Sequence, residues 1–286
     1  MSDIKLGVLG GSGLYSMEDL EVVGKVSVPT PFGEPSDQMV VGKLLGIPLV
    51  FLPRHGVGHR ISPSAINYRA NIFAFKKMGV ERIVSISAVG SMKEDIVPGH
   101  IVVPDQFIDW TRQRNSSFFP DGIVGHISFA DPVCPEMYAA VIKSAEAAGA
   151  TVHAGGTYIC VEGPQFSTRA ESDLYRTWGV DVIGMTNVTE AKLAREAGIC
   201  YVTIALATDY DCWRREEEAV TLDAVLDIMH KNVELAQSIL KEFVGELDEK
   251  RQCPCGEAAK NAVVTARDKI PASLKKELKP LFGSYL

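Results

Sequence analysis

The sequence lacks the features that would place it in a membrane, in a secretion pathway or on a nucleic acid. No apolar run approaches the ~20 residues of a membrane-spanning helix, and the start, MSDIKLGVLGGSG, has neither the basic segment nor the apolar core of a signal peptide. The 36 acidic residues outnumber the 29 basic ones, and the formal charge of −7 offers no general attraction for a polyphosphate backbone. We therefore expect a cytoplasmic protein that binds neither membranes nor nucleic acid.

The cysteines also lack the spacing typical of a metal site or of a disulfide framework. Four of the six are scattered among apolar or loop residues, which favours free core thiols: Cys134, Cys160, Cys200 and Cys212. We accordingly predict no metal. Cys253 and Cys255 differ from the rest, because only one proline separates them.

What is present is the composition of a packed globular chain. Hydrophobic residues make up 46% and charged residues 23% of the 286, which excludes a disordered tail protein and a fibrous repeat. Short β-branched runs alternate with stretches of helical spacing. The runs are 4–9, 48–52, 82–87, 101–103, 158–161, 180–185 and 201–207, and the helical stretches are 64–78, 135–148, 169–177 and 190–196. This alternation predicts a single α/β domain whose mixed, mostly buried β-sheet is flanked by helices.

Local signals mark the ends of these helices. Thr168 and Glu171 match the S/T-x-x-E capping box at a helix start. A glycine follows each of four helical stretches, where a left-handed residue is needed: Gly79, Gly149, Gly179 and Gly198. A longer helix is predicted over 221–247, after which the composition shifts to DEKRQCPCGEAAKN and a short helix at 271–282. We predict a domain over 1–248 and an appended C-terminal arm over 249–286.

Candidate site residues follow the predicted strands, because ligands of open α/β sheets bind at the carboxyl ends of strands. Three such segments carry anion-binding groups: Gly10-Gly11-Ser12-Gly13, Pro53-Arg54-His55-Gly56 and Ser87-Ala88-Val89-Gly90. Taken singly, the glycine loop is more often a plain turn, and Arg54-His55 is equally well a surface pair. Together the three segments favour a phosphate site. A dinucleotide-dependent oxidoreductase is disfavoured, because the glycine loop has Ser16 where G-x-G-x-x-G needs its third glycine.

Two further segments suggest a site for a planar base. Glu162-Gly163-Pro164-Gln165-Phe166-Ser167 follows a strand, and Phe166 offers a stacking face if it is exposed, although a buried core ring is the commoner case. Asp209 and Asp211 leave a buried strand beside aromatic residues, where carboxylates are costly unless they are partnered. One of them, kept protonated, would donate to a leaving group while the other accepts from an amino group. An ordinary acidic loop is the alternative.

Several long stretches resemble the 5′-methylthioadenosine phosphorylases of the trimeric purine nucleoside phosphorylase superfamily. They are GVLGGSGLY, TPFGEPSD, RHGVGH with PSAINYRANIFA, SAVGS, DQFIDWT, VEGPQFSTRAE, GMTNVTEAKLAREAGICY and ATDYDCW. The resemblance implies a purine nucleoside phosphorylase-like fold and attack of inorganic phosphate on C1′ of 5′-methylthioadenosine. Adenine and 5-methylthioribose 1-phosphate would be released, with no metal or organic cofactor.

The resemblance also implies a role for individual residues. The phosphate shell would be Ser12, Arg54, His55, Ser87, Ala88 and Thr186. Met185 would lie under the ribose, and Phe166, Ser167 and Thr208 would line the base site. Asp209 would assist N7 of the leaving base and Asp211 would accept from the 6-amino group. An asparagine at position 211 would better suit a 6-oxopurine, so that a 6-oxopurine or methylthioinosine phosphorylase is the second choice. A binding module without turnover is the alternative from another class.

The remaining implications concern the 5′ group, the assembly and the tail. Leu222, Val225 and Leu226 would form an apolar wall for the methylthio group, or else simply pack in the core. His126 would close this pocket from a neighbouring subunit of a homo-oligomer, a trimer or a dimer of trimers. Adenosine is expected as a secondary substrate, because a methyl-sized difference discriminates by only ~10–200-fold. Cys253-Pro254-Cys255 resembles a C-x-C pair that can form a disulfide in some members, with free thiols as the equal alternative.

Overall fold

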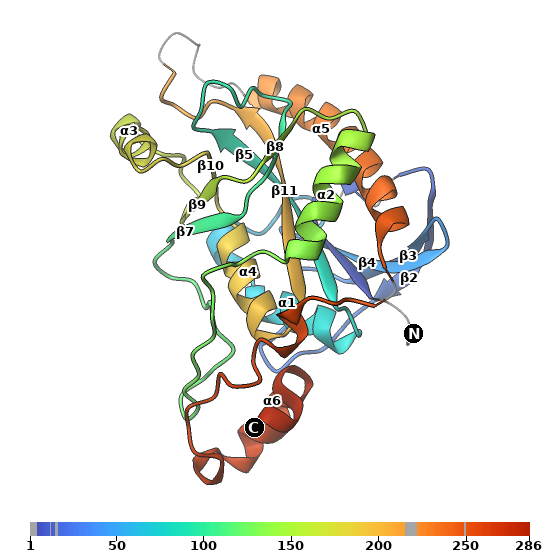
Figure 1. The fold of residues 1–286 in the computed structure, drawn as a ribbon, viewed down its shortest axis with the longest axis vertical. Helices are drawn as coiled ribbons and strands as arrows, with labels where there is room; N and C mark the ends of the chain where they lie inside the picture. The colour runs from blue at the N-terminus through green and yellow to red at the C-terminus, as the bar shows by residue number, and fades with distance from the viewer. Residues whose placement is uncertain (1–4, 12, 15–16, 215–221, 249) are drawn as a thin grey trace.

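The protein folds as one α/β domain with a mixed sheet between helices (Figure 1). The computed structural model describes residues 5–11, 13–14, 17–214, 222–248 and 250–286, and describes no side chain for 222–230 or 284. The described strands form an eleven-stranded sheet that includes the path β2-β3-β4-β1-β5-β10-β9-β7. These are β2 (Leu20–Val26), β3 (Met39–Leu44), β4 (Ile47–Pro53), β1 (Leu6–Gly10), β5 (Arg82–Ser91), β10 (Val182–Gly184), β9 (Thr157–Val161) and β7 (Gln106–Trp110).

The central strand β5 has a second long partner, β11 (Cys200–Asp209), on its other edge. β11 in turn pairs with β6 (Ile101–Val103), and β6 with β8 (Val152–Ala154). β1, β4, β5 and β11 run parallel to one another, whereas β10 runs antiparallel to β5. The carboxyl ends of the four parallel strands therefore lie at one edge of the sheet.

Each face of the sheet has its own apolar core, because successive side chains of a strand point to opposite faces. Val84 and Ile86 of β5 pack in the cluster that includes α2 (Pro135–Ala147) and α5 (Leu222–Glu246). Ile83 of the same strand packs in the cluster that includes α1 (Tyr68–Lys77) and α4 (Asn187–Glu196). The sheet is thus buried between two helix layers, as its near-continuous apolar strands predict.

The sequence-based elements agree with the structure in the core and differ at its margins. The seven predicted strands correspond to β1, β4, β5, β6, β9, β10 and β11, and the capping box of α3 (Arg169–Thr177) is confirmed. The predicted start of the first helix, at residue 64, was wrong. A 3₁₀ turn covers Pro63–Ala65, and α1 begins only at Tyr68 because the Asn67 side chain caps it by accepting from the N–H of Ala70.

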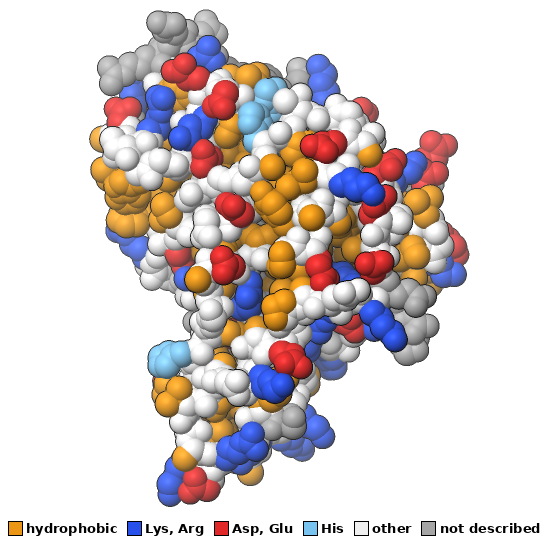
Figure 2. All heavy atoms as spheres, in the orientation of Figure 1, with side chains coloured by type: hydrophobic (Ala, Val, Ile, Leu, Met, Phe, Trp, Pro, Cys, Tyr) orange, Lys and Arg blue, Asp and Glu red, His pale blue; other side chains and the backbone are white. Residues whose placement is uncertain are grey.

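The C-terminal arm packs at the end of the molecule opposite to α3 (Figure 1). Its helix α6 (Ala272–Phe282) places Phe282 in a stacked contact with Phe119, with ring centroids 4.8 Å apart. A β-bridge between Gly125 and Val263 joins it to the segment before α2. Lysine and arginine side chains are frequent on the arm's surface at the bottom of Figure 2. Among the described helices, none has the length and hydropathy needed to cross a bilayer.

Candidate active site

The candidate site lies where β5 changes its neighbour. Residues 82–85 of β5 pair with β1, and Gly90 and Ser91 pair with β10, on the same edge of the strand. Between these two partners, residues 86–89 have no ladder partner on that edge, so that the sheet forks there. Ser87 and Ala88 lie in this fork, with Ser87 buried and Ala88 exposed. A fork of this kind is a point where strand order switches, which is the usual ligand position in an α/β sheet.

Three other strand ends meet at the fork. Arg54 follows β4, and its backbone N–H donates to the carbonyl oxygen of Gly10 at the end of β1 (3.1 Å). Thr186 follows β10, and the antiparallel direction of β10 turns this residue back toward the ends of β1 and β4. The structure thus brings together four of the six predicted phosphate residues: Arg54, Ser87, Ala88 and Thr186. Ser12 lies outside the described residues.

The guanidinium of Arg54 is buried and paired with a carboxylate. Its Nε donates to Oε1 of Glu190 at 2.7 Å, and its Nη1 donates to the carbonyl oxygen of Ile86 at 2.7 Å. Nη2 is shared among Ser85, Glu190 and the carbonyl of Leu9. Burial disfavours the charged form, but Glu190 more than compensates and raises the pKa of Arg54. Among the described contacts, one N–H on Nη1 remains for a ligand, and the pair as a whole is neutral.

The imidazole of His55 is neutral, and its Nε2 can accept a hydrogen bond. Its Nδ1 lies 2.8 Å from the carbonyl oxygen of Ile61, which can only accept, so Nδ1 carries the proton and Nε2 has the lone pair. Burial and the nearby charge of Arg54 lower the pKa of His55 to about 4. The ring is stacked on His59 with centroids 4.1 Å apart. His55 can therefore accept a hydrogen bond from a protonated anion at neutral pH.

The two aspartates leave β11 at a bulge beside the fork. The pairing of β11 with β5 shifts between Ala207 and Asp209, which sets Asp209 opposite Gly90. Asp209 accepts from the hydroxyl of Thr208 at 2.7 Å and from the N–H of Asp211 at 2.8 Å. Burial nevertheless raises the pKa of Asp209. An Asp209 carboxyl with a raised pKa is suited to holding a proton.

Asp211 connects the aspartate loop to the segment before α3. Its carboxylate accepts from the hydroxyl of Ser172 on α3, and the neighbouring thiol of Cys212 contacts the carbonyl of Ser167 at 3.3 Å. Phe166 is 85% exposed. Of the two alternatives, its ring is therefore a free stacking face and does not pack in the core. Met185 packs against Gly163, where an added Cβ would lie 2.5 Å from its sulfur.

A half-buried ion pair beside this loop, between Glu162 and Arg114, was missed by the sequence analysis. Glu162 accepts from the N–H of Arg112, from Ser64 and from Nε of Arg114 at 2.8 Å. Burial would raise its pKa, but these hydrogen bonds lower it to about 2. Arg114 in turn donates to the carbonyl of Met185 at 3.0 Å. The carboxylate and arginine therefore hold the loop and Met185 in place, and no sequence signal distinguished Arg114 from an ordinary surface arginine.

Of the residues predicted for the 5′ group, only His126 has a described side chain. The side chains of Leu222, Val225 and Leu226 lie outside the described residues, although all three positions belong to α5. His126 is exposed, and its backbone N–H donates to the carbonyl of Ala262 in the arm at 2.8 Å. Within one chain, His126 therefore belongs to the arm's neighbourhood.

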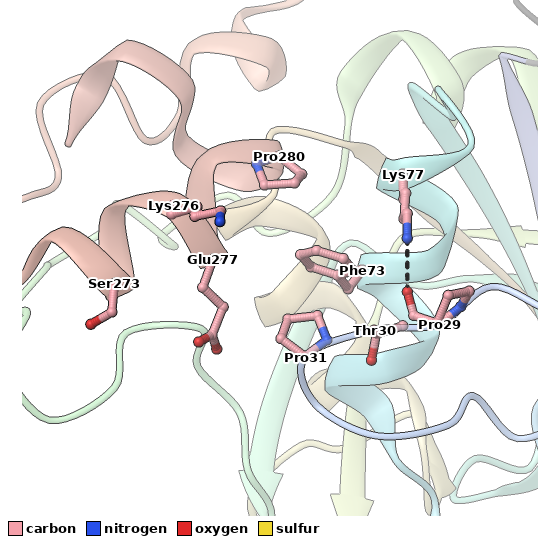
Figure 3. Close-up of a pocket in the computed structure, with 9 residues that line it drawn as sticks. All are labelled: Pro29, Thr30, Pro31, Phe73, Lys77, Ser273, Lys276, Glu277 and Pro280. Carbon is pink, nitrogen blue, oxygen red and sulfur yellow. Dashed lines mark hydrogen bonds between the residues drawn. The ribbon is translucent and has the colours of Figure 1, made fainter.

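A surface groove between α6 and α1 contains none of the predicted site residues. It is lined mainly by Pro29, Pro31, Phe73, Lys276, Glu277 and Pro280, and Lys77 donates to the carbonyl of Pro29 at its edge (Figure 3). The groove is open and lacks convergent polar side chains of the kind that orient a substrate.

The cysteines require a correction. Spacing predicted scattered free thiols at Cys134, Cys160, Cys200 and Cys212, and it left Cys253 and Cys255 as either a disulfide or free thiols. The free state is confirmed, but the scatter is wrong. The fold brings together Cys134 before α2, Cys200 at the start of β11, and Cys253 and Cys255 of the arm, with all four Sγ atoms within 4.8 Å of one another. The spacing of cysteines along the sequence can indicate only a cluster formed by neighbouring residues. This cluster is formed by three segments that are distant in sequence. All four are free thiols in the structure.

Comparison with known proteins places this fold in a family. The phosphorylase superfamily matches residues 5–245. The S-methyl-5′-thioadenosine phosphorylase of Geobacter sulfurreducens is 58% identical over 282 residues, which cover 98% of this chain and 99% of the relative. A methylthioadenosine phosphorylase from an antarctic soil metagenomic library superposes with a TM-score of 0.94 at 47% identity, covering 98% of this chain and 99% of the other.

A variant of the adenosine/methylthioadenosine phosphorylase of Schistosoma mansoni, solved in complex with methylthioadenosine, has a TM-score of 0.80 at 38% identity. The match covers 86% of this chain and 93% of the schistosome chain. The chain therefore belongs to the phosphorylase superfamily and, within it, to the S-methyl-5′-thioadenosine phosphorylases.

Proposed function

We propose that this protein catalyses the phosphorolysis of 5′-methylthioadenosine to adenine and 5-methylthioribose 1-phosphate. The proposal rests on one juxtaposition in particular. Ser87 and Ala88 lie in the fork, and Gly90, opposite Asp209, follows a few residues later on the same strand. At ~3.3 Å per residue the two subsites are separated by roughly 7–10 Å along the strand, about the span from the attacking phosphate to the base of a nucleoside. The relatives' activity and the methylthioadenosine bound to the schistosome enzyme point the same way.

In this reaction an oxygen of phosphate forms a bond to C1′ while the bond from C1′ to N9 breaks, and its electron pair goes to the purine. The hydroxyls of Ser12, Ser87 and Thr186, with the N–H of Ala88 and the free N–H of Arg54, would hold the phosphate beside the cationic sugar. His55 would accept a hydrogen bond from protonated phosphate. Asp209 would hold the proton that reaches N7 of the leaving base.

Base choice is assigned to the aspartate loop and to Phe166. The ring of Phe166 would stack on the purine, with Ser167 and Thr208 beside it and Met185 under the ribose. Ser172 orients Asp211 by donating to its carboxylate. An ionised Asp211 accepts from a 6-amino group and repels a 6-oxo oxygen, so the proposal favours adenine over hypoxanthine.

The proposal extends to the 5′ pocket and to the assembly. Leu222, Val225 and Leu226 would enclose the methylthio group, and His126 would reach this pocket from a neighbouring subunit in a trimer or a dimer of trimers. The exposed position of His126 on the arm side of its own chain agrees with a role in another subunit. Metal and organic cofactors have no part in this chemistry, and we expect the enzyme to work in the cytoplasm.

The test is chromatographic detection of free base from 5′-methylthioadenosine, adenosine and inosine, each with and without phosphate. Adenine release that requires phosphate is expected, fastest from 5′-methylthioadenosine. The Asp211→Asn variant is expected to gain activity on inosine relative to adenosine. Hypoxanthine released from inosine alone would favour the 6-oxopurine enzyme, and no release from any substrate would leave a binding module.

The subunit role of His126 has a separate test. Light scattering should give a mass of three or six chains. His126→Ala and Asp209→Asn subunits, each weakly active alone, should regain activity when unfolded together and refolded as mixed oligomers. Mixed oligomers no more active than the average of the two variants would contradict a contribution across the interface.

A further inference from the structure

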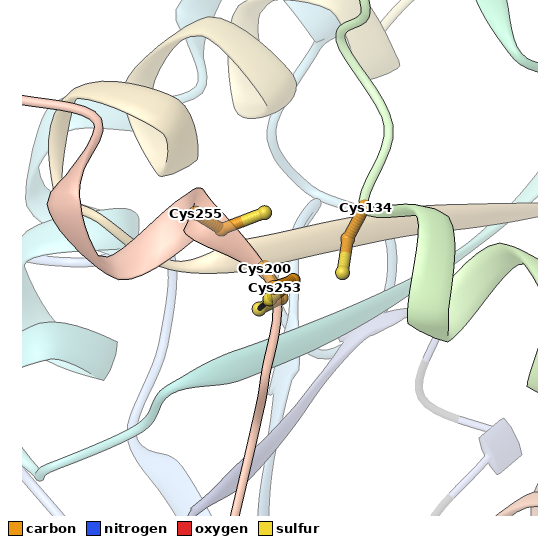
Figure 4. A group of neighbouring side chains, drawn as sticks. All are labelled: Cys134, Cys200, Cys253 and Cys255. Carbon is orange, nitrogen blue, oxygen red and sulfur yellow. Dashed lines mark hydrogen bonds between the residues drawn. The ribbon is translucent and has the colours of Figure 1, made fainter.

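The four-cysteine cluster has the geometry of a metal site and lies apart from the proposed active site. Figure 4 shows the four thiols converging from three segments: the start of α2, the start of β11 and the arm. Cys134, Cys200 and Cys255 are buried, and Cys253 is half-buried. β11 carries Cys200 at one end and Asp209 at the other, roughly 30 Å apart at ~3.3 Å per residue. The cluster therefore has no part in binding the nucleoside.

The spacing of the sulfur atoms suits tetrahedral coordination. Four Zn–S bonds of about 2.3 Å place the sulfurs about 3.8 Å apart. The observed separations are compatible with this value: Sγ of Cys200 and Sγ of Cys253 are 3.3 Å apart, and no pair of the four exceeds 4.8 Å. Shifts of up to about 1 Å in the sulfur–sulfur separations, within the reach of side-chain rotation, would bring all four sulfurs to the spacing that one zinc ion requires.

Two neighbouring groups also favour negative charge on the sulfurs. Cys134 occupies the N-cap of α2, where unpaired backbone N–H groups and the helix dipole stabilise negative charge. Nη1 of Arg251 lies 3.9 Å from Sγ of Cys200 and is held there by the carbonyl of Gly198 at 2.8 Å. A positive charge at this position would offset part of the charge of a tetrathiolate complex.

We propose that Cys134, Cys200, Cys253 and Cys255 bind one zinc ion as a structural site that fastens the C-terminal arm to the sheet. Binding releases four protons as four thiols become thiolates, so no electrons are transferred and no oxidant is needed. All four positions are then filled by protein sulfur, which leaves no open position for catalysis. Disulfides are the competing use of the same thiols, but each would remove two electrons and two protons and would need an external oxidant.

The test measures metal in the full-length protein. The chain is produced with zinc in the medium and purified anaerobically without chelator, and its zinc content and intact mass are measured. One zinc per chain, with the mass of the fully reduced polypeptide under denaturing conditions, is expected. Zinc-stripped protein titrated with Co²⁺ should develop the visible absorption of a tetrahedral thiolate complex and saturate at one ion per chain. Two disulfides in place of metal, or no saturable uptake by the reduced protein, would overturn the proposal.

Matched variants separate the site from adventitious binding. Cys255→Ser and Cys134→Ser should weaken zinc by more than the ~10–100-fold that loss of an outer partner costs. Cys160→Ala, which removes a buried thiol outside the cluster, should keep one zinc per chain. Equal zinc content in all three variants would contradict the assignment. Because the readout is metal content, this test does not depend on whether the chain phosphorolyses nucleosides.

Discussion

At the scale of single residues, three carboxylates differ in how their surroundings shift the pKa. Glu162 is stabilised by its hydrogen-bond donors, which lower its pKa to about 2. Asp209 and Glu196 are dominated instead by burial, which raises the pKa of both, that of Glu196 to about 7. A group with a raised pKa costs stability once it is ionised. Glu162 and the other two carboxylates therefore respond to pH and to neutral substitution in opposite ways.

Asp209→Asn is expected to lose activity and to gain stability. The amide holds no transferable proton, so turnover of 5′-methylthioadenosine should fall by roughly 10²-fold or more, with KM for phosphate nearly unchanged. The folded-state pKa of Asp209 is raised, so its cost is absent at low pH and complete above that pKa. Thermal unfolding should accordingly show a higher Tm for the variant near neutral pH. An unchanged turnover rate would remove Asp209 from its assigned role.

The stability gained by Glu196→Gln is expected to depend on pH in the same direction as that gained by Asp209→Asn, although Glu196 has no role in catalysis. Glu196 accepts from the hydroxyl of Ser117 and from the N–H of Phe118, but burial raises its pKa from 4.5 to about 7. Its destabilising effect therefore appears as pH rises from about 4.5 to about 7. The variant should be more stable than the parent by about 1–3 kcal/mol near pH 8 and no more stable near pH 4.5. Urea unfolding at the two pH values measures the difference, and an equal difference at both would contradict it.

At the scale of elements, the fork in β5 depends on a buried polar network behind it. Glu190 of α4 accepts from Arg54, from Ser85 of β5 and from the hydroxyl of Tyr201 on β11. One carboxylate thereby connects β4, β5, β11 and α4 just below the predicted phosphate position. The fork is held open by this network rather than by strand pairing.

Removing Glu190 should be costly, because it leaves the charge of Arg54 buried and unpaired. Glu190→Ala is expected to lower the free energy of unfolding by about 3–5 kcal/mol. The control is Glu246→Ala, which breaks the exposed pair with Lys143 and should cost less than ~1 kcal/mol. Denaturant unfolding compares the two. A loss for Glu190→Ala as small as that of the control would show that Arg54 can find another partner.

The elements that the sequence predicted are those whose pattern is set by burial. β1, β5 and β11 are buried along nearly their whole length, so their apolar runs are continuous. β2 has a mostly exposed pattern with Val22 and Val23 on the surface, and none of the three residues of β8 is buried, so neither strand shows a continuous apolar run. These strands form because they can pair with the free edge of a neighbouring strand. That pairing is set by the tertiary structure and cannot be read from the local sequence.

The candidate site shows the same division. The residue types at the strand ends indicated an anion site, and the family resemblance indicated which residues take part. The fork was not predictable, because it depends on β10 running antiparallel to β5 and turning Thr186 back. The pairing of Arg54 with Glu190 and the meeting of the four thiols were missed for the same reason, since 136 residues separate the first pair.

At the scale of the whole molecule, the arm is held by apolar packing as well as by the cysteine cluster. Leu278, Leu281 and Phe282 of α6 are buried in the core cluster that contains α1 and α4. The arm carries eight basic and four acidic residues over 249–286, in a chain whose net charge is negative. Its charge and its apolar face thus both favour contact with the body of the protein.

Phe282→Ala should loosen the arm without reaching the fork. Loss of the buried ring is expected to cost about 3–5 kcal/mol, and amide exchange should speed up in the segment 118–126 that the arm contacts. Val264→Ala, at a side chain that is 66% exposed on the same arm, should change the unfolding free energy by less than ~0.5 kcal/mol. Exchange that stays slow over 118–126 in the Phe282 variant would contradict the packing argument.

The position of β5 between β1 and β11 also has a consequence for synthesis of the chain. β5 can pair with β1 once residue 91 has been made, but its other edge is free until β11, at Cys200–Asp209, leaves the ribosome. For more than a hundred residues of translation, the growing chain therefore carries an apolar strand edge open to other chains. Ribosome pausing or truncation before residue 200 is expected to yield aggregates, whereas chains that extend past β11 have this edge covered.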